Sequence, residues 1–560
     1  MQMQAAAHSV RRQQCGLGQE QDTSSVPRAT SQTNFLPGFT MSKDVAADIP
    51  AAEAPAKRAP LNKYALACAI LASMNSILLG YAYVSVMSGA QIFMKRDLKI
   101  TDAQIEVLAG IINIFSLVGS LAAGRTSDWI GRRYTMVLAS VIFFAGALIM
   151  GLAPSYAVLM LGRFVAGVGV GYALMIAPVY TAEVAPTSAR GLLTSFPEVF
   201  INTGVLLGYI SNYAFHGLPV HLSWRAMFLA GAVPPVFLAV GVLAMPESPR
   251  WLVMQGRIGD ARRVLEKTSD SPEEAVERLA DIKSAVGIPE GIADDNNDEL
   301  LAIVRKNKGT HGEGVLRDLL LHPTPPVRRI LIACLGLQFF QQASGIDSVV
   351  LYSPRVFEKA GIKSDANTLG ATISVGATKT LFILVATFLL DRVGRRPLLL
   401  TSAGGMVVSL VTLASTLHVI AQRASPADGA TALSGVSIAS VLMFVASFSI
   451  GMGPIAWVYS SEIFPLRLRA QGCALGTAMN RIMSGAITMS FYSLSHKITL
   501  AGNFYLYASI AAAGWVFMFC FLPETRGRGL EDTEKLFGGG DGVEKEDGHG
   551  HAESTELTTQ

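Results

Sequence analysis

The chain has 560 residues, of which 51% are hydrophobic and 16% are charged, and its formal net charge is +3. Soluble proteins carry about 25% charged residues, so this composition excludes a soluble domain as the main part of the chain. The small net charge gives no indication of a nucleic-acid partner. The five cysteines are an odd number, and four of them lie in apolar stretches, so no disulfide framework is predicted.

In chain order, the apolar runs predict membrane spans. Residues 1–60 are polar and are predicted to form a disordered cytoplasmic tail. Six apolar runs follow, near residues 64–88, 105–125, 135–153, 157–180, 192–214 and 226–245. Six more come after a polar segment, near residues 330–354, 369–390, 397–420, 435–460, 470–495 and 503–522. Each run is long enough to cross a bilayer core of about 30 Å as a helix.

The sequence therefore predicts an all-α membrane protein with 12 transmembrane helices, arranged as two six-helix bundles over residues 61–246 and 329–522. A loop of short helices, 247–328, connects them, and residues 523–560 form a second tail. Within the loop, Ser271 is followed by a proline and two acids, which is typical of a capped helix start. An amphipathic helix is expected from there to Val286.

The distribution of lysine and arginine predicts the orientation. An even number of spans places both termini on one side. The short loops of the two sides hold equal numbers of basic residues, and the basic flanks of the tails and of the long loop add to the terminal side. The positive-inside rule therefore predicts that both termini and the long loop are cytoplasmic.

Three motifs of acids and arginines occur twice, in the same order and at similar offsets, which indicates two related halves. Their spacing places them at cytoplasmic helix ends. Acids and arginines repeated together predict a gating network of ion pairs between the bundles that forms in one conformation and breaks in another. The alternative is that the arginines only anchor helix ends to headgroups. The residues are Asp128, Arg132, Arg133, Glu183, Glu247, Arg250, Asp391, Arg395, Arg396, Glu462 and Glu524.

These motifs resemble those of the sugar porters of the major facilitator superfamily. The segments 202–204, 341–347 and 453–457 are similar to those of plant polyol/monosaccharide transporters. The resemblance covers roughly residues 62–530. It implies a monomeric secondary transporter, not an enzyme and without a cofactor, that moves polyols such as sorbitol, xylitol and inositol-like compounds, and monosaccharides, by alternating access. We expect it in the plasma membrane, with the vacuolar membrane as the alternative.

Polar residues deep within the spans predict a shared cavity. Counted from the basic helix ends, Gln341, Lys379 and Asn480 lie about 16–18 Å deep, near the bilayer midplane, and Glu198 lies about 12 Å deep. Buried ionisable groups of this kind are expensive and usually functional. Amides can donate to and accept from polyol hydroxyls, and carboxylates accept from them strongly.

The resemblance adds particular roles. It places the sugar-contacting positions at Gln341, Gln342, Asp347, Trp457 and Asn480. Glu198 falls where many relatives have Gln, Asp347 and Lys379 fall where many have Asn, and Tyr352 falls on a gate position. We expect an Asp347–Lys379 ion pair, because an unpaired charge at this depth is costly. The alternative is that each faces a water-filled cavity alone. Gly345 is expected to break the seventh span.

We expect a proton symporter, with protons as the second partner and an uncoupled facilitator as the alternative. In proton-coupled relatives, Arg163 partners an aspartate of the first helix, which the segment 80–85 of this chain lacks. Three explanations compete: another acid carries the proton, with Glu198 favoured over Asp347; the protein is an uncoupled facilitator; or the segment contains a sequence error. Arg163 then needs another acceptor, such as Tyr83, a backbone carbonyl or Glu198. A third functional reading is a non-transporting sugar sensor, which the short tail and loop disfavour.

Overall fold

The computed structural model describes residues 62–82, 86–186, 189–286, 288, 323–362, 364–422, 430–464 and 468–525. Within these ranges the regular secondary structure is helical, and no β-strand occurs. The predicted tail 1–60 and most of the tail 523–560 lie outside the described residues.

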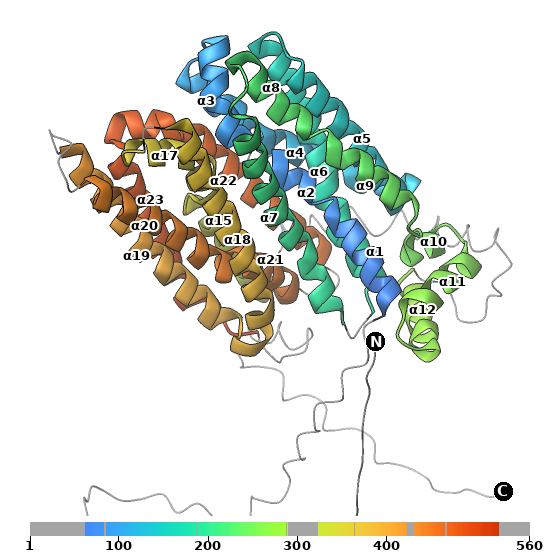
Figure 1. The fold of residues 1–560 in the computed structure, drawn as a ribbon. Helices are drawn as coiled ribbons and strands as arrows, with labels where there is room; N and C mark the ends of the chain where they lie inside the picture. Colours follow the sequence, from blue (N-terminus) through green and yellow to red (C-terminus); the bar gives the residue numbers. More distant parts are fainter. Residues whose placement is uncertain are drawn as a thin grey trace, which may run out of the picture. The chain divides into compact units, whose positions relative to one another are not determined.

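In the first half of the chain, helices cover all six predicted spans (Figure 1). The first span is divided into three helices, and the sixth into two. The helices are Lys63–Met74 (α1), Ile77–Gly80 (α2), Val86–Leu98 (α3), Asp102–Ile130 (α4), Arg132–Gly151 (α5), Tyr156–Val184 (α6), Arg190–Phe215 (α7), Val220–Ala230 (α8) and Val233–Leu243 (α9).

Helices also cover the six predicted spans of the second half. Its first span is again divided into three helices, but here the fourth span, and not the sixth, is divided into two. The helices are Pro325–Ala343 (α15), Ile346–Leu351 (α16), Ser353–Lys359 (α17), Asp365–Val393 (α18), Arg395–Gln422 (α19), Ala430–Ile450 (α20), Met452–Ile463 (α21), Arg469–Ile498 (α22) and Leu500–Phe521 (α23).

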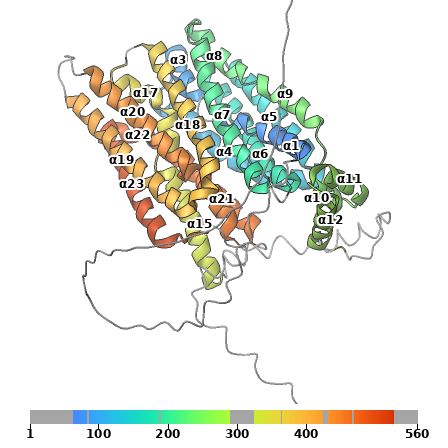
Figure 2. The same ribbon diagram turned by 60° about the horizontal axis from the view of Figure 1, so that its bottom comes forward.

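The two halves pack side by side, with α4 against α22 and α7 against α18 (Figures 1 and 2). Within each half the helices pack on one another, as in the pairs α5–α6 and α19–α20. The largest apolar cluster takes buried residues from both halves, among them Leu108, Met150, Tyr209, Tyr352 and Phe491. The all-α arrangement of two six-helix bundles is therefore confirmed.

Nine helical segments of the described chain are long and apolar enough to cross a membrane. The three predicted spans outside that set are those of α7, α15–α16 and α22. These three carry most of the polar residues singled out in the sequence, and such residues lower the mean hydropathy of a span; Lys379 is the exception and lies on α18. The residues on these three spans are Glu198, Gln341, Gln342, Asp347 and Asn480.

The turn between α4 and α5 has a counterpart between α18 and α19. Gly131 has φ 95° and Gly394 has φ 104°, in the left-handed region that glycine adopts without steric cost. A Cβ atom at Gly131 would lie 2.4 Å from a carboxylate oxygen of Glu247, and one at Gly394 would lie 3.1 Å from Glu524. The glycine of the repeated motif therefore permits both the turn and the close approach of an acid.

Three short helices follow α9: Pro249–Met254 (α10), Ile258–Thr268 (α11) and Pro272–Val286 (α12). The predicted helix to Val286 is thus confirmed. They share a small apolar core that includes Leu252, Leu265 and Leu279. The Arg278 side chain of α12 donates to the carbonyls at the end of α6, at 3.0 Å for Ala185, and so attaches these helices to the first half. We call the side of the molecule that carries α10–α12 the loop face (Figure 2).

Candidate functional site

Amide side chains form a buried network between α15 and α22. Asn480 Nδ2 donates to Oε1 of Gln338 at 2.8 Å and to Oε1 of Gln341 at 2.6 Å. Gln342 Nε2 donates to Asn480 Oδ1 at 3.3 Å. The three glutamines share one face of α15 because they are spaced three and four residues apart. The structure therefore brings Gln341, Gln342 and Asn480 together, as predicted.

The same network reaches the interrupted tenth span. Gln341 Nε2 donates to the carbonyls of Met452 and Gly453, both at 3.0 Å, where α20 ends and α21 begins. Gln338 Nε2 donates to the Ala456 carbonyl at 3.3 Å. Trp457, the next residue of α21, is half-buried. An interrupted helix frees backbone carbonyls, and here the glutamines satisfy them.

Gly345 divides the seventh span, as predicted. Its φ is 83°, and it separates α15 from α16. Asp347 in the first turn of α16 accepts a hydrogen bond from Ser484 Oγ of α22. This interaction joins the carboxylate to the helix that carries Asn480.

Tyr352 lies where α16 ends and α17 begins. Its hydroxyl donates to the Thr488 carbonyl at 3.0 Å. Its ring stacks on Phe491, with the ring centroids 4.5 Å apart and the planes 12° apart. Tyr352 is fully buried among aromatic side chains, so it does not line an open cavity in this structure.

Four ionisable side chains gather where α7 faces the second half. Lys379 of α18, Arg481 of α22 and Asp347 are close enough to act electrostatically on the Glu198 carboxylate of α7. Glu198 is half-buried, whereas Lys379, Arg481 and Asp347 are buried. The cluster therefore places one acid in the first half opposite two cations and one acid in the second half.

Arg481 connects this cluster to the amide network. Its Nη2 donates to Asn480 Oδ1 at 2.7 Å. On the other side of the cluster, Asn202 Nδ2 donates to Glu198 Oε1 at 3.4 Å. Charged and amide groups thus form one continuous polar region, although a hydrophobic core surrounds it. Such a region can bind a ligand that carries several hydroxyl groups.

The expected Asp347–Lys379 ion pair is wrong. Among the described residues no ion pair joins these two side chains; Asp347 bonds to Ser484, and Lys379 acts on Glu198. The reason lies in the packing: α18 packs against α7 of the first half, whereas α16 packs against α22. The helix that carries Lys379 therefore packs against the helix that carries Glu198.

Arg163 is fully buried on α6, and its Nη1 donates to the Ala82 carbonyl at 2.9 Å. Its guanidinium also lies 5.7 Å from the ring centroid of Phe228. A backbone carbonyl, one of the predicted alternatives to the missing aspartate, is thus its acceptor. Tyr83, another alternative, lies outside the described residues.

The repeated acid–arginine motifs form matching clusters at the loop-face ends of the two halves. In the first half, Arg132 pairs with Glu183 at 3.0 Å and with Asp128 at 3.1 Å. Ser248 Oγ donates to Glu183 at 2.5 Å. Arg250 is exposed and makes no ion pair within the described chain.

In the second half, Arg395 pairs with Glu462 at 2.9 Å, and Thr525 Oγ1 donates to Glu462 at 2.8 Å. Arg396 Nη2 donates to the Phe519 carbonyl at 2.6 Å. The Asp391 side chain lies outside the described residues. The arginine–glutamate pair and the hydroxyl group that donates to that glutamate therefore recur in both clusters.

The acids after the sixth and twelfth spans cap helices. Glu247 accepts from the backbone N–H groups of Arg132 at 2.9 Å and Arg133 at 3.1 Å, at the start of α5. Glu524 accepts from those of Arg395 and Arg396 at 3.0 and 2.9 Å, at the start of α19. Burial raises the pKa of Glu247, and these N–H groups oppose that shift.

The gating ion pairs were expected between the bundles, but these contacts join helices of the same half. Arg132 and Glu183 both belong to the first half, and Arg395 and Glu462 both belong to the second. The tight glycine turns hold each arginine beside acids of its own half. A sequence repeat cannot distinguish contacts within a half from contacts between halves.

Contacts on the side opposite the loop face join the two halves. Arg96 pairs with Asp365 at 2.8 Å. The buried Glu106 accepts from the Ser493 N–H at 2.8 Å and from its hydroxyl at 2.6 Å. Tyr209 in α7 donates to the Val350 carbonyl at 2.7 Å. These contacts hold the halves together on that side.

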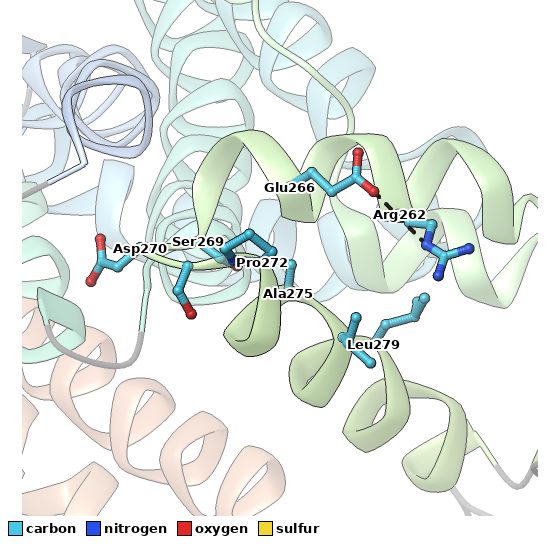
Figure 3. Close-up of a pocket in the computed structure, with 9 residues that line it drawn as sticks. Arg262, Glu266, Ser269, Asp270, Pro272, Ala275 and Leu279 are labelled. Carbon is cyan, nitrogen blue, oxygen red and sulfur yellow. Dashed lines mark ion pairs between the residues drawn. The ribbon is translucent and has the colours of Figure 1, made fainter.

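A cavity of about 400 Å³ lies between α11 and α12, apart from this polar region (Figure 3). Figure 3 shows the Arg262–Glu266 ion pair on one side of it and Leu279 on the other. Its wall is made by the loop helices alone. It is therefore separate from the candidate substrate site.

The sequence reasoning missed Gln338, Arg481 and Ser484. Each had a sequence signal: Gln338 precedes Gln341 by three residues, and Ser484 follows Asn480 by four, so each shares a helix face with a predicted residue. Arg481 had the signal of a basic residue inside a span.

The fold and site define a polytopic membrane protein in which two related six-helix bundles flank a polar region. Residues 68–537 match the family described as Sugar (and other) transporter, and the chain belongs to this family. It is 63% identical to Polyol transporter 5 of Arabidopsis thaliana over 491 residues, 88% of this chain and 89% of the relative. It is 32% identical to Glucose transporter GlcP of Staphylococcus epidermidis over 473 residues, 84% of this chain and 97% of that protein.

The fold is also that of a solved transporter. The structure of the proton:xylose symporter XylE bound to 6-bromo-6-deoxy-D-glucose is similar, with a TM-score of 0.67 and 26% identity. The similarity covers 85% of this chain and 99% of that one. This likeness agrees with the two-bundle architecture described above.

Proposed function

We propose that the protein is a secondary transporter that moves polyols and monosaccharides across a membrane by alternating access. The observation that carries the proposal is the continuous polar region formed by the α15–α22 amides and the four charged side chains. Its donors and acceptors match the hydroxyl groups of a polyol. Trp457 offers an apolar surface for the C–H face of the ligand. The similarity to Polyol transporter 5 supports this substrate class.

The proposed substrate-binding set joins the residues of this polar region with Tyr352, which the sequence analysis placed at a gate position. It combines amides, which recognise hydroxyl groups, with charges, which make the site more polar than amides alone. The set is Glu198, Gln341, Gln342, Asp347, Tyr352, Lys379, Trp457 and Asn480. We extend it to Gln338, Arg481 and Ser484 because each forms a hydrogen bond to a member of the set.

We propose proton symport with Glu198 as the proton-carrying acid. Ionised Glu198 attracts Lys379 and Arg481 of the other half, whereas a protonated Glu198 does not, so its protonation changes the electrostatic interaction between the halves. The similarity to a proton:xylose symporter supports coupling.

One observation favours an uncoupled facilitator as the second candidate. Arg163 donates to the Ala82 backbone carbonyl, an acceptor that does not titrate. If no other acidic side chain binds and releases a proton during transport, the protein equilibrates its substrate across the membrane without proton coupling.

The orientation and location complete the proposal. The loop face is cytoplasmic, which agrees with the basic residues of the loop and tails. The plasma membrane is the proposed location, and the chain is proposed to act as a monomer. The proposed division is 1–60, 61–246, 247–328, 329–522 and 523–560. We propose that the repeated ion-pair clusters act as gates by fixing the loop-face helix ends within each half, and not by joining the halves.

The test is uptake of radiolabelled sorbitol into proteoliposomes, with and without an inward proton gradient. Xylitol, inositol and glucose are the competitors. Symport predicts accumulation above equilibrium, up to about tenfold per pH unit for one proton per substrate, which a protonophore abolishes. Uptake that ignores the gradient identifies a facilitator. If none of the four compounds enters, the transport proposal fails and a non-transporting sensor becomes the better reading.

A further inference from the structure

A second cavity, of about 390 Å³, lies at the loop face where the first half meets the short helices. Part of its wall comes from the first turns of α1 and α5, and part from α10 and α11. Its charged lining consists of Arg133, Glu247, Arg257, Asp260, Arg263 and Lys267. This cavity is distinct from the candidate substrate site, which lies between α7 and the second half.

The two acids of the lining are already bound to other groups. Asp260 pairs with Arg257 at 2.5 Å and with Arg263 at 3.0 Å. Glu247 accepts the backbone N–H groups that begin α5, including that of Arg133. Four cations therefore face two acids whose oxygens are occupied, and the lining carries excess positive charge.

Two of the cations have no carboxylate partner within the described part of the chain. The Arg133 side chain donates to the Met245 carbonyl at 3.2 Å, and its Nε is buried without a hydrogen bond to a described residue. The Lys267 side chain is exposed and forms no ion pair within the described chain. The backbone carbonyl of Lys267 accepts a hydrogen bond from the Asn62 side chain. These side chains retain donors for an anion.

Aromatic side chains place the cavity at the level of lipid headgroups. Tyr64 in the first turn of α1 is 40% exposed, and Tyr134 in the first turn of α5 is 51% exposed. The Arg133 guanidinium lies 5.0 Å from the centroid of the Tyr134 ring. Trp251 completes the aromatic part of the lining. Tyrosine and tryptophan at the ends of membrane helices mark the membrane–water interface.

We propose that this cavity binds a phosphate anion, supplied by the headgroup of an anionic phospholipid. A phosphate can accept hydrogen bonds from Arg133 and Lys267 while the acyl chains remain in the bilayer beside Tyr64 and Tyr134. Anionic lipids are concentrated in the cytoplasmic leaflet. This choice of lipid rests on the orientation given in the proposed function, since that orientation makes the loop face cytoplasmic.

Occupancy would join two parts of the protein. Tyr64, Arg133 and Tyr134 belong to the first bundle, whereas Trp251 and Lys267 belong to the loop helices. A ligand that contacts both parts stabilises their association by mass action. Bound lipid should therefore raise the thermal stability of the protein.

The test is binding of short-chain lipids to the purified full-length protein in detergent, measured by native mass spectrometry and by the shift in Tm. The ligands are dioctanoyl phosphatidic acid, dioctanoyl phosphatidylcholine and inorganic phosphate. The expected result is that phosphatidic acid binds and raises Tm, and that the other two do so weakly. Removal of one cation near the bilayer should weaken binding about fivefold.

Lys267→Gln is the test variant, because the Lys267 side chain is exposed and its loss does not threaten folding. Arg262→Gln is the matched control: it removes one positive charge from the same helix but from the wall of the other cavity. Selective weakening by Lys267→Gln supports the site. Equal weakening by both variants, or none by either, overturns it. Phosphate that binds as tightly as phosphatidic acid overturns the lipid assignment. Because no step measures transport, a failure of the proposed function in the uptake assay does not affect this result.

Discussion

Glu106 offers a quantitative test of how the two halves are held together. Its side chain on α4 is only 2% exposed, and it accepts two hydrogen bonds from Ser493 on α22. A hydrogen bond to a charged group contributes about 1.5–3 kcal/mol net. Glu106→Ala should therefore destabilise the closed arrangement opposite the loop face by about 3 kcal/mol or more. That corresponds to roughly a 150-fold shift in the equilibrium between closed and open forms of that side.

Ser493→Ala provides an intermediate step. It removes the hydroxyl donor and leaves the backbone N–H, so its effect should be about half, roughly a tenfold shift. Lys95→Ala is the control, because it removes the Lys95–Asp102 ion pair, which lies within the first half, and leaves Asp102 beside His496 of the second half.

The assay is a distance distribution between spin labels at positions 99 and 359, which lie in the two halves near this interface and are exposed. The closed population should fall in the order wild type and Lys95→Ala, then Ser493→Ala, then Glu106→Ala. If Glu106→Ala keeps the wild-type distribution, the contact does not contribute to closure and the reasoning is refuted.

Three further variants test the site and the fold. Glu198→Gln should leave sorbitol uptake measurable but abolish proton-driven accumulation, whereas retained accumulation would exclude Glu198 as the coupling acid. Asn480→Ala leaves two buried amide oxygens without their donor, at a cost of about 1–3 kcal/mol each, so Tm should fall and the KM for sorbitol should rise; unchanged values would contradict the network. Gly345→Ala combines φ 83° with a Cβ 2.5 Å from Tyr507 and should strongly reduce folded yield, whereas Gly259→Ala, with nothing within 4 Å, should be tolerated. Equal yields would show that the break does not need glycine.

The repeated motifs show which features follow from the local sequence and which follow from tertiary packing. Glu247 and Glu524 each cap the start of a helix, and each helix follows a glycine with positive φ. A glycine, two arginines and a distant acid are all visible in the sequence. Their identical arrangement in both halves follows because each half folds by the same contacts.

The sequence alone determined the all-α architecture, the positions of the spans and the break at Gly345. Span positions follow from the hydrophobic run that a bilayer requires, and the break follows from the freedom of glycine, so both are local properties. The depth count also placed Gln341 and Asn480 together correctly, because residue rise along a helix is constant.

Only the tertiary structure decided which charges face one another. Within the described chain no ion pair joins Lys379 to Asp347, because α18 packs against α7 while α16 packs against α22. The acid–arginine pairs likewise form within each half, as Arg132 with Glu183 shows. Depth along a helix axis can be counted from the sequence, but the rotation of each helix and its neighbours are fixed by packing across the whole bundle.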